Sequence, residues 1–126
     1  MSPETVSQAV KAYFAAIRAM NEEAWIDTFA EDAVSHDPVG APAIVGHQRL
    51  KEFFQTITSA FKEMGLTEED VFIAGNSAAV KWSGRGISQR GRKAHFEGID
   101  VFEVNEAGKI QTLRAYWNPA EMMAQL

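Results

Sequence analysis

The sequence predicts an α+β fold, in which a curved, mostly antiparallel sheet wraps over three N-terminal helices and leaves a cone with an open mouth. Apolar residues follow helical spacing in the first half of the chain, and from Thr67 onward they alternate with polar residues, as they do in strands. Helices followed by consecutive strands are typical of this class. Because the 126 residues contain no linker, internal repeat or low-complexity tract, we expect a single domain over residues 1–126.

Three helices are expected in the first half of the chain. Ser2 has the chemistry of a helix cap, and the apolar stripe that follows it continues to about Met20. A short second helix begins at Asn21 and runs to about Phe29. The third helix is predicted to end near Gly65, and its apolar side consists of Leu50, Phe53, Phe54, Ile57 and Phe61.

Alternating polar and apolar residues predict the strands, and turns that contain glycine separate the later ones. The strands are expected at residues 33–37, 69–74, 78–88, 93–104 and 109–118. Residues 40–46 are expected to form a loop. A final short helix at 119–123 carries methionines that would line a lipid-like ligand or close the cone.

Composition disfavours several classes of protein. The net charge of −5 argues against a general nucleic-acid binder, because phosphate binding depends on clustered Lys and Arg. Without cysteine, the chain offers no disulfide, thiolate metal site or cysteine nucleophile. The three histidines lack the spacing of metal ligands, so no metal is expected. With neither a secretory leader nor a membrane-length apolar run in the sequence, a cytoplasmic location away from membranes is the default expectation.

Asp100 is the most informative residue, because it falls on the apolar face of a predicted strand. Side chains alternate across a sheet, so Asp100 shares its face with Phe96 and Phe102. A charge there is costly unless it is paired, and the alternative is for the carboxyl to keep its proton and donate a hydrogen bond. A bulge at Gly98 would instead turn Asp100 toward solvent, and this alternative stays open.

Two further side chains could act with this carboxyl. Tyr13 lies on the apolar stripe of the first helix, and a buried phenol normally finds a partner for its hydroxyl. A core tyrosine bonded to one backbone carbonyl would also explain it. Asp37 precedes Pro38, and Asp-Pro is a common way to open a turn. Their joint presence with Asp100, in a chain that predicts a cone, favours a shared site.

Several stretches carry a family resemblance, namely residues 9–16 (AVKAYFAA), 29–33 (FAEDA), 37–40 (DPVG), 99–102 (IDVF) and 114–117 (RAYW). Through them the sequence resembles the ketosteroid isomerases of the nuclear transport factor 2-like superfamily, which also includes polyketide cyclases of the SnoaL type. The matching stretches span most of the chain, from about Val6 to Asn118. The resemblance implies that Asp37 is the base and that Tyr13 and Asp100 form the oxyanion hole.

The activity implied by the resemblance is that of a steroid delta-isomerase. A small hydrophobic carbonyl substrate, such as a 3-oxo-Δ5 steroid, would enter the cone and lose a proton to Asp37. Tyr13 and Asp100 would then bind the dienolate oxygen. Neither a metal nor an organic cofactor is implied. Two alternatives stay open, a SnoaL-type cyclisation of another carbonyl compound and a non-catalytic cone that binds a hydrophobic ligand.

The walls of the cone supply the expected substrate contacts, and two positions depart from the isomerase pattern. Phe54 stands where some isomerases have a second tyrosine beside the catalytic one. His36 stands where an acid is common before the base, so it pairs with Asp37, extends into the pocket or faces water. The predicted substrate-binding residues are Phe54, Trp82, Phe96, Phe102 and Trp117.

The opposite face of the predicted sheet has apolar residues in the middle of a charged surface. Such a patch suits a homodimer interface. Its members are Lys81, Ser83, Arg85, His95, Glu97, Ile99, Val101 and Glu103.

Overall fold

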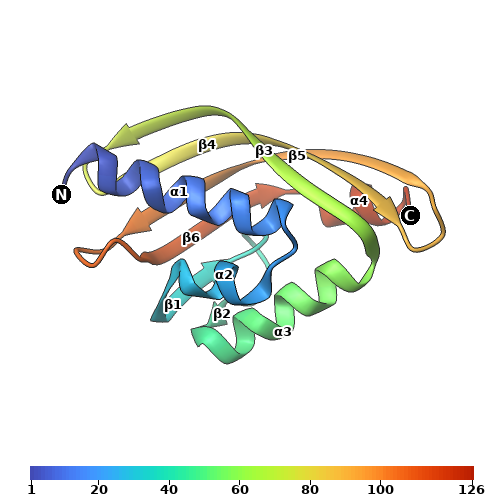
Figure 1. Ribbon diagram of the computed structural model, residues 1–126, viewed down its shortest axis with the longest axis horizontal. Coiled ribbons are helices and arrows are strands. Elements are labelled where there is room, and N and C mark those ends of the chain that lie inside the picture. The colour runs from blue at the N-terminus through green and yellow to red at the C-terminus, as the bar shows by residue number, and fades with distance from the viewer.

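The computed structural model describes residues 1–126 as a six-stranded sheet with four helices (Figure 1). The helices are α1 (Pro3–Arg18), α2 (Glu22–Asp27), α3 (Gly46–Ser59) and α4 (Pro119–Met123). The strands are β1 (Phe29–His36), β2 (Ile44–Val45), β3 (Phe61–Ala74), β4 (Ser77–Ser88), β5 (Lys93–Val104) and β6 (Ile110–Trp117). None of the helices combines the length and apolar character that crossing a membrane requires.

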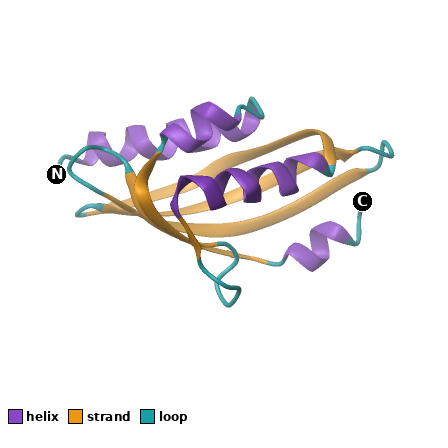
Figure 2. Cartoon of the chain, turned by 90° about the horizontal axis from the view of Figure 1, so that it is seen from below, coloured by secondary structure: helices purple, strands orange, loops and turns teal.

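The sheet is curved, and its strands run in the order β2-β1-β6-β5-β4-β3. Only β1 and β6 are parallel, and every other neighbouring pair is antiparallel. α1 packs mainly on β3 and α3 mainly on β1, so helices lie over strands from both edges of the sheet (Figure 2). α2 contacts both α1 and α3. The predicted α+β fold is confirmed.

The hydrophobic core lies between the sheet and the helices. On α1, the predicted stripe is buried, and the Ser2 side chain caps the helix by accepting a hydrogen bond from the Thr5 N–H. β4 and β5 alternate buried and more exposed residues along much of their length, as expected for strands with one face on the core. The core therefore meets the sheet along one face, which is where Asp100 also lies.

Residues 61–68 were predicted wrongly in part, because the third helix was expected to continue to Gly65. α3 ends at Ser59 and β3 begins at Phe61. Phe61 continues the helical spacing of α3, but it also pairs with Ser88 of β4, and this ladder prevails over the local pattern. The Gln89 amide donates to the carbonyls of Ser59 and Phe61 and fixes the change of direction.

Two smaller differences concern the first strand and the loop after it. β1 begins at Phe29, earlier than the predicted start at residue 33, because α2 already ends at Asp27. The predicted loop at 40–46 contains the short strand β2, which pairs with β1 through Val45 and Ile44. Such a two-residue strand is too short to show an alternating pattern.

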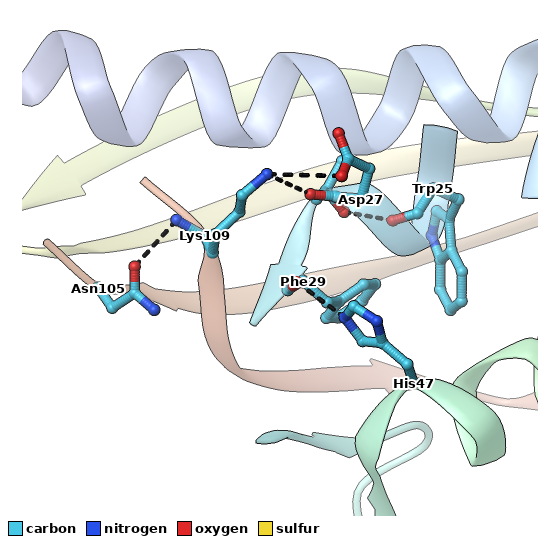
Figure 3. A network of polar contacts seen from close by, with 7 residues as sticks. Trp25, Asp27, Phe29, His47, Asn105 and Lys109 are labelled. Carbon is cyan, nitrogen blue, oxygen red and sulfur yellow. Dashed lines mark hydrogen bonds and ion pairs between the residues drawn. The ribbon is translucent and has the colours of Figure 1, made fainter. Parts of the chain in front are cut away.

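Polar contacts hold the junction between α2 and β1 (Figure 3). The Thr28 hydroxyl donates to the carbonyl oxygen of Trp25 over 2.6 Å. Nζ of Lys109, just before β6, donates to the carbonyl oxygen of Asp27 over 2.7 Å. These bonds use backbone oxygens at the end of the helix, so α2 ends in a fixed place and Trp25 is held against the core.

The side chain of Gln125 joins α4 to β5, with hydrogen bonds like those of a neighbouring strand. β5 continues past the end of β6, whose last pair is Trp117 with Gly98, so His95 has no β6 residue opposite it. The Gln125 amide fills this position: Nε2 donates to the His95 carbonyl and Oε1 accepts from the His95 N–H, each over 2.8 Å. This pair holds α4, with Met122 only 1% exposed beneath it, against the sheet.

We expect Gln125→Ala to release α4 from β5 while the sheet stays folded. Two hydrogen bonds to His95 and a third to the Glu121 carbonyl are lost at an accessible site, so the free energy of unfolding should fall by about 1–3 kcal/mol. Hydrogen exchange measured by NMR should show faster exchange of the His95 amide. Gln55→Ala removes an exposed hydrogen bond to Glu22 and is the matched control. If His95 is equally protected in both variants, Gln125 is not what holds the C-terminal helix.

Candidate active site

Tyr13, Asp37 and Asp100 come from three separate parts of the chain and line one cavity. Tyr13 belongs to the buried stripe of α1, Asp37 directly follows β1, and Asp100 lies on the buried face of β5. β1 and β5 both flank β6, which places the two acids on either side of that strand. The structure thus brings together the three residues that the sequence singled out.

The cavity is almost entirely apolar. Thirteen of its 15 lining residues are hydrophobic, and the other two are Asp37 and Asp100. The space between its atoms, which includes open solvent at the mouth, is about 510 Å³. Only a small part of this space is wide enough for a water-sized molecule. Besides Tyr13, Asp37 and Asp100, which we call the three acids because each can release a proton, the lining consists of Ile17, Trp25, Phe53, Phe54, Ile57, Met64, Leu66, Trp82, Phe96, Ala115, Trp117 and Met122.

Asp100 is buried without an ionic partner, with only 2% of its surface exposed. β5 pairs with β4 in unbroken register, Trp82 opposite Gly98 and Val80 opposite Asp100, so no bulge turns the carboxyl outward. Its Oδ1 has no hydrogen-bond partner. Burial, reinforced by the nearby charge of Asp37, raises the pKa of Asp100 well above its ordinary value, which favours the protonated carboxyl.

Tyr13 is likewise enclosed, with 3% of its surface exposed. Its ring packs edge-on against Phe14 and Phe102, with ring centroids 5.1 Å away in each case. Burial raises the pKa of the phenol well above 10, any negative charge on Asp100 or Asp37 raises it further, and the only hydrogen-bonding group that opposes this shift is the Trp25 side chain. No backbone carbonyl accounts for the hydroxyl, so Tyr13 remains a proton donor that faces the cavity.

Asp37 differs from the other two acids because it is partly exposed and has a firm partner. Nε1 of Trp117 donates to its Oδ1 over 2.6 Å. Burial raises the pKa of Asp37 from 3.8 to about 6, and the Trp117 hydrogen bond, which stabilises the carboxylate, limits the increase. Near neutral pH, Asp37 is therefore the acid of the three that is ionised.

Gly98 allows two indoles to approach β5 closely. A Cβ at this position would lie 2.6 Å from the Trp82 ring, 2.7 Å from the carbonyl oxygen of Tyr116 and 2.8 Å from Cβ of Trp117. The two indoles meet edge to face, with ring centroids 6.0 Å apart. The glycine that suggested a possible bulge thus serves to pack the wall of the cavity.

Four of the five predicted substrate-binding residues, Phe54, Trp82, Phe96 and Trp117, line the cavity. Phe102 does not. It shares the inward face of β5, as predicted, but it is fully buried behind Tyr13 and Phe14, because α1 packs over that part of the sheet.

Trp25 lines the cavity and was missed in the sequence. It lies on a six-residue helix, which is too short for its spacing to indicate an inward face. His36 is half-buried and does not line the cavity. No group of three or more His, Asp or Glu side chains is placed to hold a metal ion.

The raised pKa of Asp37 predicts a pH-dependent cost to stability. A carboxyl with a folded-state pKa above its unfolded value destabilises the fold as the pH rises past about 3.8, and the cost is complete above about 6. Asp37→Asn should therefore be more stable than the parent near pH 8, by up to about 3 kcal/mol for roughly two pKa units. Urea unfolding should show this gap closing below about pH 4. A gap of equal size at both pH values would contradict the assignment.

Comparison with known proteins finds a matching family and a relative of similar length. A family model described as "SnoaL-like domain" matches residues 10–113. A steroid delta-isomerase of Nocardioides simplex is 32% identical over 124 residues, which cover 98% of this chain and 97% of that relative.

Solved structures with the same fold include enzymes of more than one kind. Delta 5-3-ketosteroid isomerase from Mycobacterium sp. has a TM-score of 0.82 and 24% identity, over 94% of this chain and 96% of that chain. SalBIII, an epoxide hydrolase/cyclase-like enzyme in pyran ring formation, has a TM-score of 0.83 and 23% identity, over 94% of both chains. With the family match, the identity to the Nocardioides isomerase and the shared curved sheet, this chain belongs to the SnoaL-like domain family of the nuclear transport factor 2-like superfamily.

Proposed function

We propose that this chain is a ketosteroid isomerase-like enzyme that moves a double bond in a 3-oxo-Δ5 steroid or a similar hydrophobic enone. The observation that carries the proposal is a cavity in which one acid ionises near neutral pH while two buried acids beside it favour their protonated forms. Such a set supplies one base and two hydrogen-bond donors. The name of the Nocardioides relative, steroid delta-isomerase, supports the same reaction.

In the proposed reaction, Asp37 accepts the proton from the carbon between the ketone and the isolated double bond. The electrons of that C–H bond move toward the ketone oxygen, and a dienolate forms. Asp37 then returns the same proton two carbons further along, which gives the conjugated enone. Since the proton leaves and re-enters the substrate, the reaction needs no other reactant. A base with a pKa of about 6 is suited to both steps, because it accepts and releases the proton near neutral pH.

Tyr13 and protonated Asp100 bind the oxygen on which negative charge develops. Both are held in a site with little room for water, where hydrogen bonds to a developing charge are stronger than in bulk solvent. Both are neutral donors, so neither repels the ionised Asp37 before the substrate enters. The loss of one such donor typically slows a reaction by a factor of about 100 to 1,000.

Entry of a steroid requires side chains at the cavity to move, because little of the 510 Å³ is open in the free protein. Met122 is the flexible member of the lining near the C-terminus, and α4, which carries it, is anchored by the side chain of Gln125. A hydrophobic substrate with a carbonyl at one end matches this lining. Its apolar body would contact the hydrophobic walls, and its carbonyl would meet the polar groups of Tyr13, Asp37 and Asp100.

A second candidate is acid-base chemistry on another carbonyl compound, as in a SnoaL-type cyclisation. The fold shared with SalBIII, an epoxide hydrolase/cyclase-like enzyme, supports this second candidate. Asp37 would again be the base, and Tyr13 and Asp100 would again stabilise an oxygen. The two candidates differ in substrate and not in the roles of these residues.

We also propose that the chain forms a homodimer through the outer face of the sheet. Ile99 and Tyr116 are opposite each other on β5 and β6 and are 45% and 49% exposed. Phe72 on β3 is 71% exposed. A second copy of the chain would cover these aromatic and aliphatic side chains together with the Lys81–Glu97 ion pair, whose lysine is opposite Ile99 on β4.

The isomerase proposal predicts turnover of a 3-oxo-5-ene steroid, followed through the ultraviolet absorbance of the conjugated product. Asp37→Asn should abolish most of the activity, and Tyr13→Phe or Asp100→Ala should each lower kcat by about 100- to 1,000-fold. For the parent, kcat/KM should rise with pH through about 6, as Asp37 becomes ionised.

Phe102→Leu is a useful control for these variants, because Phe102 packs behind Tyr13 without lining the cavity. It should cost stability and much less activity. Full activity of Asp37→Asn would rule out the assigned base. A steroid that binds to the parent and is never isomerised would favour a non-catalytic binding cone, and no binding at all would favour the cyclase.

The homodimer proposal predicts a dimer mass for the parent in size-exclusion chromatography with light scattering. Ile99→Lys places a second cation opposite Lys81 and beside Tyr116, and it should yield a folded monomer. Phe72→Ser is a second test on another strand of the same face. A parent that elutes as a monomer at micromolar concentration would contradict this interface.

A further inference from the structure

The structure leaves three buried polar side-chain atoms without a partner, and all three belong to residues that line the cavity. They are Nε1 of Trp25, Nε1 of Trp82 and Oδ1 of Asp100. Unpaired buried polar atoms are rare in folded proteins, so each needs a physical reason. The proposed reaction uses the proton of Asp100 but assigns no role to either indole.

Each unpaired indole lies beside one of the two proton-donating acids. The Trp25 and Tyr13 ring centroids are 6.0 Å apart. Trp82 and Asp100 project from neighbouring strands on the same face of the sheet, because Trp82 is opposite Gly98 and Asp100 is opposite Val80. Burial raises the pKa of both acids, and the Trp25 side chain opposes this increase for Tyr13 as the Trp82 side chain does for Asp100.

The neighbouring rings fix the direction of both indoles. Trp25 packs on Phe29 and Phe54, with ring centroids 4.8 and 4.9 Å away, and its backbone carbonyl accepts a hydrogen bond from the Thr28 hydroxyl. Neither phenylalanine has a polar atom to offer Tyr13. Trp82 packs edge-on between Phe96 and Trp117, each 6.0 Å away.

Indole N–H groups can donate a hydrogen bond but cannot accept one. A phenol or a neutral carboxylic acid has one proton to donate and lone pairs that accept. When an indole donates to a lone pair of the acid, the acid's own proton cannot be directed at the indole and must find another acceptor. Donation to the acid also makes it a stronger donor, because hydrogen bonds in a chain polarise one another.

We propose that Trp25 and Trp82 are positioning residues that donate to Tyr13 and Asp100, respectively, and thereby direct both acidic protons at one oxygen of the ligand. Asp100 would accept through Oδ1 and donate through its other oxygen. In the free protein these bonds are not yet well formed, as is common for catalytic hydrogen bonds before the substrate binds. The inference rests on the proposed function for the identity of the ligand oxygen. The pairing of Trp25 with Tyr13 and of Trp82 with Asp100 rests on the unpaired atoms.

The test uses a conjugated 3-oxo steroid with ¹³C at the ketone carbon, which is a reaction product and needs no turnover. Infrared spectroscopy of the bound ketone reports the strength of the hydrogen bonds that it accepts. We expect Trp25→Phe and Trp82→Phe each to move the carbonyl frequency part of the way back toward its value in an apolar solvent. Affinity should fall about three- to tenfold, the range for one ordinary hydrogen bond. Affinity for the same steroid skeleton without the ketone should change less than twofold.

Two controls separate a hydrogen bond from packing. On a Tyr13→Phe background, Trp25→Phe should have no further effect on the carbonyl frequency, because the indole acts through the phenol. Phe53→Leu changes an apolar lining residue that carries no indole, so it should weaken the binding of both steroids alike and leave the carbonyl frequency of the bound ketone unchanged. If the two phenylalanine variants weaken both steroids equally, or leave the carbonyl frequency unchanged, the inference is overturned.

A second measurement is made on the complex with the conjugated 3-oxo steroid, and it replaces only the indole N–H, so that packing and folding are kept. The chain has only two tyrosines, so ¹³Cζ-tyrosine labelling gives two NMR signals, and the half-exposed Tyr116 is an internal reference. Benzothienylalanine, in which sulfur replaces the indole N–H, should shift the Tyr13 signal when placed at position 25 and leave the Tyr116 signal in place. An unshifted Tyr13 signal overturns the Trp25 part. Tryptophan-dependent ketone binding without isomerisation would instead sink the proposed function and leave this inference standing.

Discussion

The structure depends most on a carboxyl buried in an apolar wall with no cation to balance it. Asp100 has no salt-bridge partner, and its only nearby charge, Asp37, repels a second negative charge. Under that constraint the proton stays on Asp100, and a group that would be a liability as an anion becomes a neutral donor. Tyr13 is subject to the same two influences, burial and the charge of Asp37. The ionised state of one acid therefore helps to set the protonated state of the other two.

The fold creates this separation through differences in depth. Asp37 lies where β1 ends and the chain turns, so it keeps some exposure and an indole N–H that stabilises its charge. Asp100 lies in the middle of a strand with neighbours on both sides, and Tyr13 lies under α2 and the aromatic core. Asp37 at the end of a strand and Asp100 within a strand line the same cavity, yet their carboxyl groups have different pKa values because their surroundings differ. Aromatic rings rather than aliphatic chains make much of the wall, and three of them carry a donor N–H.

Much of this arrangement could be predicted from the sequence, because periodicity reports which side of an element is buried. The alternation in β5 placed Asp100 inward, and the helical stripe of α1 did the same for Tyr13. Periodicity could not place Asp37, which follows a strand, and there the family resemblance was needed. It also could not separate Phe96 from Phe102: both face inward, but α1 covers one and leaves the other at the cavity, a tertiary effect. Phe61 fitted a helix and a strand equally well, and only pairing with β4 decides between them.

The amide of Gln125 has a consequence for how the C-terminal segment can vary. It bonds to His95 as a residue of a neighbouring strand would, while Met122, three positions earlier, lines the cavity. In a helical segment, each inserted or deleted residue turns the following side chains by about 100°. After an insertion or deletion between these two positions, Met122 and Gln125 could therefore no longer face the cavity and His95 at the same time. Substitutions between residues 122 and 125 keep this spacing, whereas an insertion or deletion there would change how the C-terminal segment borders the cavity.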